Sequence, residues 1–319
     1  MALVSNNIFN LYNILHLTMN YCKKYQVELC HDKTRLLYFP PSSPQPDIFY
    51  NPIKVNNQQI SFAKQVEHVG VIRSSTGNLP HLLGRFAAHR KALGGVLFSG
   101  VARNHHGNLA AVMKIENIYA VPVLLSGVAS LVLTKSEENM IEQHYICTLR
   151  NLLKAYPGTP RSFVLFMCGS LPATALLNLR QLSLFSMVCR LPGDPLHNRA
   201  IHCLTKAKPS TKSWFNKIRE LCQVYCLPHP LTLLREPLPK EIFKKMVKSQ
   251  VMLYWETKLR EEASLLPSLE YFNPYFHSLA RPHPLLSTPG SNPHEVAKAV
   301  VQCRTKSGRY RTSLLARHW

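Results

Sequence analysis

The sequence has few acidic side chains. It contains 17 Asp and Glu residues against 38 Lys and Arg residues in 319 positions, a formal net charge of +21. A basic excess of this size favours a polyanionic partner, nucleic acid first, over a merely basic surface. The carboxylates are also dispersed, with no Asp-Asp or Asp-x-Asp pair. Because two-metal phosphoryl transfer requires such a pair, we expect no bound metal, no other cofactor and no polymerase activity from this chain alone.

Paired cysteine motifs are missing too. The nine cysteines are scattered, which argues against a disulfide framework or a disulfide-linked partner. This usage favours a reducing compartment inside the cell, cytoplasmic or nuclear. Cys222, Cys226 and His229 approach a zinc pattern, but no second pair completes a four-ligand set. A zinc site therefore stays open beside the simpler interpretation of three structural side chains.

No stretch has the length and apolarity of a transmembrane helix. The most apolar one, residues 118–133, has 16 residues and contains Pro122 and Gly127, whereas a spanning helix needs about 20. The first lysine is Lys23, after the N-terminal apolar positions, which does not fit a signal peptide. We expect no membrane partner. P-loop, dinucleotide, nucleophile-elbow and His-Glu-x-x-His patterns are absent as well.

The N-terminal part indicates a helix that leads into a strand. Apolar residues recur three or four positions apart over residues 8–22, which is one face of a helix. Residues 36–39 are short, apolar and aromatic, and Pro40 stops them, as expected of a strand. Lys33 stands at the mouth of that strand, where it would present one cation to a ligand.

Four stretches resemble the reverse transcriptases of non-LTR retrotransposons. Residues 20–39 resemble the end of that family's palm, where a helix leads into a Lys-Thr strand. Residues 1–7, Met-Ala-Leu-Val-Ser-Asn-Asn, resemble the strand after its aromatic-Ala-Asp-Asp turn, which carries two metal-binding aspartates. Val69-Gly70-Val71 is similar to its apolar-Leu-Gly-apolar hairpin that holds the primer end, with Val for Leu. Residues 119–127 are similar to a thumb run, aromatic-x-x-Pro-x-Leu-Leu-x-Gly.

The resemblance implies RNA-directed DNA synthesis in a parent polymerase, with Mg²⁺ bound by carboxylates that this chain lacks. We therefore expect a reverse transcriptase fragment that is inactive alone and binds RNA, DNA or an RNA–DNA hybrid. Lys33 is a candidate phosphate contact or proton donor. The residues expected to contact nucleic acid are Lys33, Gly70, Arg73, Arg85, Arg90, Lys91 and Arg103.

Two strand patterns occur between residues 53 and 72, in the part of the chain that includes Gly70. Residues 53–55 and 60–62 alternate as strands around Asn56-Asn57 and predict a hairpin. Residues 66–72 follow as a further strand, in which Gly70 marks a bulge or a close backbone approach. A primer contact at Gly70 and a plain sheet-edge glycine both fit this pattern.

Residues 79–103 predict a helix with a basic side and no carboxylate. The basic side is expected to hold His81, Arg85, His89, Arg90, Lys91 and Arg103. Since no acid is available for i,i+4 pairing, an exposed phosphate-binding stripe is favoured over a salt-bridged face. A plain solvated helix face is the alternative.

The predicted fold class is α+β, with a small antiparallel sheet from the end of a polymerase palm followed by a predominantly α-helical thumb and extension. The predicted domains are 1–76 (palm end with a primer-grip-like hairpin), 77–191 (helical thumb) and 192–319 (helical, basic extension). Within them we expect a core helix broken at Pro122, a helix capped by Thr134 or Ser136, and a long helix with a lysine face from Lys240 to Lys248.

Two other classes compete with the polymerase interpretation. One is a helical nucleic-acid-binding or scaffold protein with no polymerase history. The other is a decayed, non-functional reading frame whose truncated palm cannot bury its sheet.

Overall fold

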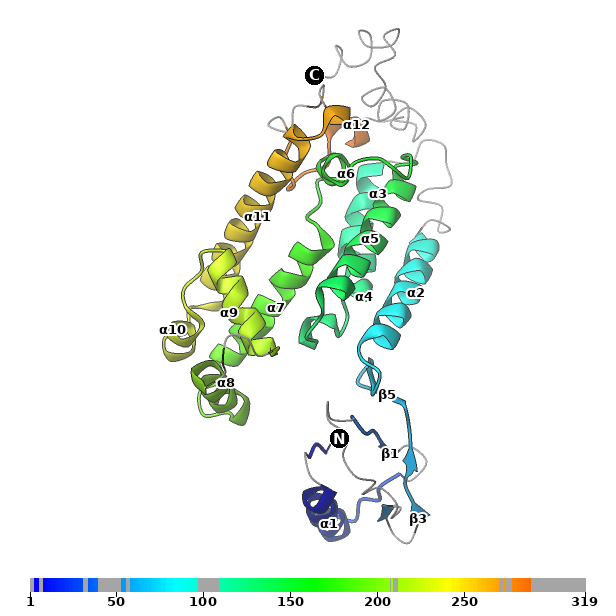
Figure 1. Ribbon diagram of the computed structural model, residues 1–319, viewed down its shortest axis with the longest axis vertical. Helices are drawn as coiled ribbons and strands as arrows, with labels where there is room; N and C mark the ends of the chain where they lie inside the picture. Colours follow the sequence, from blue (N-terminus) through cyan, green and yellow to red (C-terminus); the bar gives the residue numbers. More distant parts are fainter. Residues whose placement is uncertain are drawn as a thin grey trace. The chain divides into compact units, whose positions relative to one another are not determined.

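The computed structural model describes residues 3–5, 8–30, 34–39, 53–55, 58–96, 109–206, 208, 212–269, 272 and 277–287. The chain divides into two compact units, Met1–Leu83 and Gly84–Trp319. All of the described strands belong to the first unit, and the second is built from helices (Figure 1). The α+β class is therefore confirmed.

The first unit packs helix α1 (Ile8–Lys24) against short strands. This helix confirms the prediction made from the apolar periodicity over residues 8–22. Its Leu15 forms a small core with Ile53 and Ile60, and partly buried side chains such as Leu11 and Leu36 surround that core. The predicted strand at residues 36–39 is shorter and earlier, since β1 is Arg35–Leu36.

The strands form three separate pairs. β1 runs parallel to β4 (Ser61–Phe62), β2 (Lys54–Val55) runs antiparallel to β3 (Gln58–Gln59), and β5 (Gln65–His68) runs antiparallel to β6 (Val71–Ser74). The expected small antiparallel sheet is thus present among the described residues as two antiparallel pairs, and a parallel pair accompanies them. The hairpin expected around Asn56-Asn57 is present as the β2–β3 pairing, although its second strand begins earlier than predicted.

The strand predicted over residues 66–72 is instead a hairpin. Val69 and Gly70 join β5 to β6, with φ values of 51° and 73°. Two successive residues in the left-handed region are the geometry of a type I′ turn, whose twist matches that of the paired strands. Gly70 thus provides a positive φ at a turn, and it is neither a bulge nor a site of close backbone approach.

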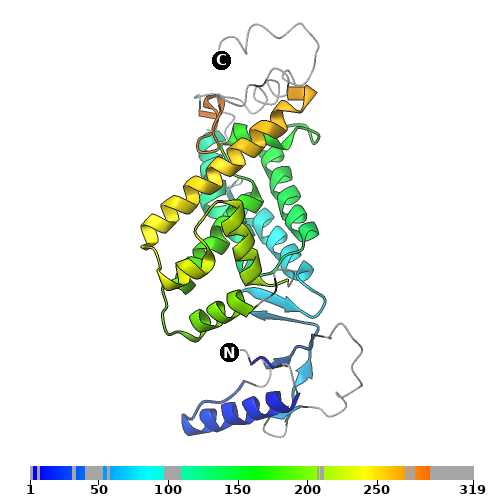
Figure 2. The same cartoon turned by 60° about the vertical axis from the view of Figure 1, so that its left-hand side comes forward.

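The second unit is a bundle of helices. Its elements are α2 (Leu79–Val96, which begins in the first unit), α3 (Leu109–Ile115), the π-helical turn η4 (Glu116–Ala120), α4 (Val121–Leu124), η5 (Val128–Ser130), α5 (Lys135–Leu152), α6 (Arg161–Cys168), α7 (Ala173–Cys189), α8 (Pro195–Lys206), α9 (Trp214–Val224), α10 (Pro230–Arg235), α11 (Lys240–Ser264), η6 (Pro267–Leu269) and α12 (Pro284–Ser287). Helix α7 packs against α5, α8, α9, α10 and α11 (Figure 2). It is accordingly buried on several faces, as a helix at the centre of a bundle must be.

The long helix α11 buries one residue in every four. Its buried positions are Phe243, Val247, Val251, Trp255, Leu259 and Ala263. A four-residue repeat follows one ridge of the helix surface, the ridge that packs into the groove of a neighbouring helix. Tyr225 fixes this packing, because its hydroxyl accepts bonds from Trp255 Nε1 at 3.0 Å and Asn178 Nδ2 at 2.7 Å. Helices α7 and α11 are thus joined through Tyr225, which caps α9.

The backbone does not break at Pro122. Helix α3 continues through η4 into α4, and Pro122 stands in the first turn of α4. A proline there lacks the N–H for a regular helical bond, and the π-helical turn just before it changes the bonding pattern without ending the helix. The cap prediction is confirmed at Thr134, which forms a capping box with Glu137.

No single helix among the described residues combines the length and apolarity needed to cross a membrane. Of the described helix pairs, only α6–α7, bent by 63°, meets those criteria when taken together.

Candidate nucleic-acid interface

The solvent-facing side of α2 carries cations without acidic partners. Arg90 and Lys91 are exposed, and Arg85 is half-buried. Among the described residues, no carboxylate lies within ion-pair distance of any of these three side chains. Arg90 and Lys91, named here the α2 basic pair, are therefore available to bind an anion from solution.

The two histidines assigned to this basic side lie instead in the interior. His81 and His89 are fully buried. His81 Nδ1 accepts a hydrogen bond from the Ile72 backbone N–H at 3.2 Å. Buried polar side chains occupy core positions when they find hydrogen-bond partners, so the expectation that both histidines lie on the exposed basic side of the helix is wrong.

His89 connects α2 to two other helices. Its Nδ1 is 3.1 Å from His144 Nε2 on α5, and its Nε2 is 3.4 Å from Glu116 Oε1 on η4. Phe86 stacks on the His144 ring, with centroids 4.4 Å apart. This His144–His89–Glu116 chain, named here the imidazole chain, fixes the inner face of α2 and thereby the direction in which Arg90 and Lys91 point.

Burial shifts the pKa of two members of the imidazole chain, Glu116 and His144. Burial raises the pKa of Glu116, and the adjacent His89 opposes that rise. Burial, with the positive charges of His89 and Arg90, lowers the pKa of His144 to about 4. Burial therefore disfavours the charged form of Glu116 and of His144 alike.

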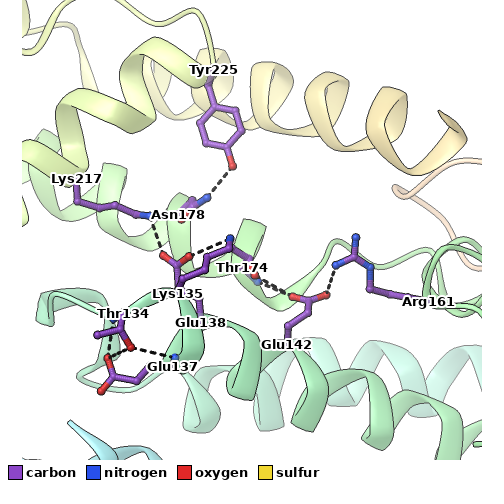
Figure 3. A network of polar contacts seen from close by, with 10 residues as sticks. All are labelled: Thr134, Lys135, Glu137, Glu138, Glu142, Arg161, Thr174, Asn178, Lys217 and Tyr225. Carbon is purple, nitrogen blue, oxygen red and sulfur yellow. Dashed lines mark hydrogen bonds and ion pairs between the residues drawn. The ribbon is translucent and has the colours of Figure 1, made fainter. Parts of the chain in front are cut away.

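Three glutamates of the bundle are buried, and two of them, Glu138 and Glu142, appear with their partners in Figure 3. Glu142 accepts bonds from the Thr174 N–H and hydroxyl, both at 3.0 Å, and so stabilises the N-terminus of α7. Glu138 pairs with Lys217 at 2.7 Å. Glu116, Glu138 and Glu142 are all buried. These three acids therefore serve contacts inside the bundle.

The other residues predicted to contact nucleic acid lie either in the first unit or outside the described residues. Gly70 and Arg73 belong to the β5–β6 hairpin of the first unit, where Arg73 is exposed and lies opposite Val66. Lys33 and Arg103 lie outside the described residues. The tip residue Val69 is 87% exposed, which is unusual for a large apolar side chain in a strained conformation.

The three candidate zinc ligands, Cys222, Cys226 and His229, differ in burial and in their structural roles. Cys222 is buried in α9, and burial raises its pKa to about 12. Cys226 is exposed beyond the end of that helix, and His229 Nδ1 accepts from the Leu231 N–H to cap α10. Across the described ranges, no group of three or more His, Cys, Asp or Glu side chains is arranged to hold a metal ion. The described cysteines are all free thiols.

Sequence reasoning missed the imidazole chain and the role of Glu116. The available signal was position: His89 follows Leu82 and Phe86 at helical spacing, on the apolar side of α2. Its partners His144 and Glu116 are distant in the chain, so the contact itself had no local signature.

Comparison with known proteins gave no match: no family model, curated protein or solved structure is similar to this chain at the level of significance required.

Proposed function

We propose that this protein binds a nucleic-acid duplex through the α2 basic pair, as the thumb of a non-LTR retrotransposon reverse transcriptase would. The observation that carries the proposal is an exposed Arg90–Lys91 pair without an acidic partner in the described residues, on a helix with no carboxylate. Two adjacent cations on one helix face contact phosphates without reading base sequence. The proposal concerns binding, and the expected ligand is an RNA–DNA hybrid.

The charge balance of the bundle supports this proposal. Three of its glutamates, Glu116, Glu138 and Glu142, are buried, while Arg90 and Lys91 stay solvated. Long-range attraction of a polyanion depends on that surface charge and not on the composition. The imidazole chain supports it further, because a helix anchored on its inner face presents its outer cations in a fixed direction.

The β5–β6 hairpin supplies a second proposed contact. Val69 at its tip is exposed and has a positive φ, a conformation that a β-branched residue adopts at an energetic cost. Strained, exposed residues are common where a ligand is held. In the reverse transcriptase interpretation, this tip and Arg73 contact the primer strand.

The test is binding of a labelled RNA–DNA hybrid across a salt series, comparing wild type with Arg90→Glu/Lys91→Glu. Loss of two phosphate contacts should flatten the slope of log K against log salt by about 1.8. The matched control is Lys114→Glu/Lys154→Glu, which makes the same charge change at exposed lysines elsewhere in the bundle.

Equal slopes in the two variants would contradict the proposal, because binding would then follow net charge and not the α2 basic pair. Arg85 is left unchanged in this test, since its Nε is buried and a reversal there would disturb packing.

A further inference from the structure

The first half of α11 carries a row of lysines. Lys240, Lys244, Lys245 and Lys248, named here the α11 lysine face, are all exposed. They lie beside the buried ridge of Phe243 and Val247, so the helix backbone that carries them is held by the bundle. Their positions on the helix are therefore fixed, although their charged ends reach into solvent.

These lysines have no acidic partners within the described chain. Glu241 is four residues before Lys245, the favourable order for a helical pair, yet the two charged groups are not within ion-pair distance. No carboxylate of another described element approaches the face either. The row is a net positive surface and not one side of a salt-bridge network.

One of the lysines, Lys240, stands in the first turn of the helix. The N-terminal end of a helix carries a partial positive charge, so a cation there reduces helix stability. The opposite half of α11 carries Glu256 and Glu262, and both have structural uses. Glu256 Oε1 accepts from Ser278 Oγ at 2.9 Å, and Glu262 pairs with Arg161 at 2.7 Å. The lysines have no such contact, so an internal structural role does not account for them.

We propose that the α11 lysine face is a second nucleic-acid-binding surface, which holds the phosphate backbone of a single strand. Lys240, Lys244 and Lys248 follow one another at intervals of four residues, about 6 Å along the helix axis each. A single row of flexible point charges fits one strand and has no planar, bidentate group for base recognition.

A membrane surface fits this face less well. An interfacial helix inserts an apolar side between its cations and the lipid. The apolar ridge of α11 is already buried against α6 and α7; of the exposed apolar residues of this helix, Ile242 borders Lys245 as a single side chain and Leu253 follows the last lysine of the row by five residues. The surface therefore offers charge without an insertable apolar side.

The test uses the full chain with single-stranded RNA of mixed sequence, and compares wild type with Lys244→Gln/Lys248→Gln. Loss of two single-strand phosphate contacts should lower the salt slope by about 1.4. The same variant should melt at about the wild-type temperature, because glutamine keeps helix propensity and both positions are exposed. Weaker binding by a protein of undiminished stability is the signature of a binding surface.

Two controls and one alternative ligand complete the experiment. Lys244→Arg/Lys248→Arg keeps the charge and should bind as wild type does, and Lys114→Gln/Lys154→Gln should keep the wild-type slope. An unchanged slope in Lys244→Gln/Lys248→Gln overturns the proposal. So does lysine-dependent binding to phosphatidylserine vesicles but not to RNA.

The α11 lysine face and the α2 basic pair are proposed to bind the same class of ligand, nucleic acid, but the two proposals are otherwise independent. If Arg90→Glu/Lys91→Glu impairs hybrid binding while the α11 variant binds single-stranded RNA normally, this inference fails alone. If only the α11 variant impairs binding, the duplex proposal fails alone.

Discussion

The two units differ in how far each buries its apolar side chains. In Met1–Leu83 the core cluster consists of Leu15, Ile53 and Ile60, while Leu17 and Tyr21 on the same helix are mostly exposed. In Gly84–Trp319 large side chains such as Tyr145 and Phe185 are wholly enclosed by helices. Buried apolar area is the main source of stability, so the second unit is stabilised by its own core and the first only weakly by its own. The difference predicts that Met1–Leu83 has a lower free energy of unfolding than Gly84–Trp319.

The largest effect should come from Gly169→Ala in the second unit. Gly169 ends α6 with φ at 59°, and an added Cβ would overlap the backbone of Arg281 and Pro282. Backbone cannot move aside as a side chain can, so we expect a loss of about 3–5 kcal/mol from strain and clash together. Urea denaturation measures this loss in the free energy of unfolding. Gly193→Ala is the control, because Gly193 has φ at 81° but open space, and it should cost about 1–2 kcal/mol. Equal losses would contradict the close approach at Gly169.

A smaller and local effect is expected from Leu15→Ala in the first unit. This change removes one of three side chains from the core cluster, at a cost of about 2–3 kcal/mol. Hydrogen exchange should show faster exchange of α1 amides and unchanged exchange in α7. Leu17→Ala, on the exposed side of the same helix, should change neither. Faster exchange in α7 after Leu15→Ala would mean that the two units unfold together.

The imidazole chain predicts opposite pH dependences for two of its members. The pKa of Glu116 is raised in the fold, so its contribution is full below its ordinary value of 4.5 and is lost as the pH rises through the folded pKa. The pKa of His144 is lowered to about 4 from 6.5, so its contribution is full above pH 6.5 and is lost as the pH falls toward 4. Other groups near the chain are Arg90, Tyr145 and Cys168.

Denaturation at several pH values separates these two contributions. Glu116→Gln should gain stability relative to wild type as the pH is raised above 4.5. His144→Gln should gain relative to wild type below pH 6.5, by about 1–2 kcal/mol once partial exposure is allowed for. Parallel stability profiles for wild type and Glu116→Gln would show that Glu116 has the same pKa in the folded and unfolded protein.

The smallest effect should come from the hairpin tip. Val69→Asn creates an Asn-Gly turn, which accepts two positive φ values more readily than Val-Gly does. We expect the first unit to gain about 0.5–1 kcal/mol, read from slower exchange of the β5–β6 amides. Gly70→Ala should instead lower the stability of the first unit, since Gly70 has φ at 73°, where an alanine side chain is strained. A loss of stability in Val69→Asn would mean that the Val69 side chain packs against something at the tip.

Local signals predicted local structure well. The periodicity of α1 and the N-cap at Thr134 each depend on a few neighbouring residues, and both are found in the fold. The Val69-Gly70 turn was missed because a β-branched residue before glycine is typical of a strand. The wrong placement of His81 and His89 has a different cause. Whether a histidine faces solvent or core depends on its partners, and for His89 these are Glu116 and His144 on other helices.

The central claim is that a nucleic-acid duplex contacts the outer face of α2, and ultraviolet crosslinking to an RNA–DNA hybrid with peptide mapping tests it most directly. We predict crosslinked peptides that contain Arg90 and Lys91, with yields that fall as salt rises. The Lys114 and Lys154 peptides should not be crosslinked. Crosslinks confined to peptides outside α2, or equal yields at all exposed lysines, would contradict the account.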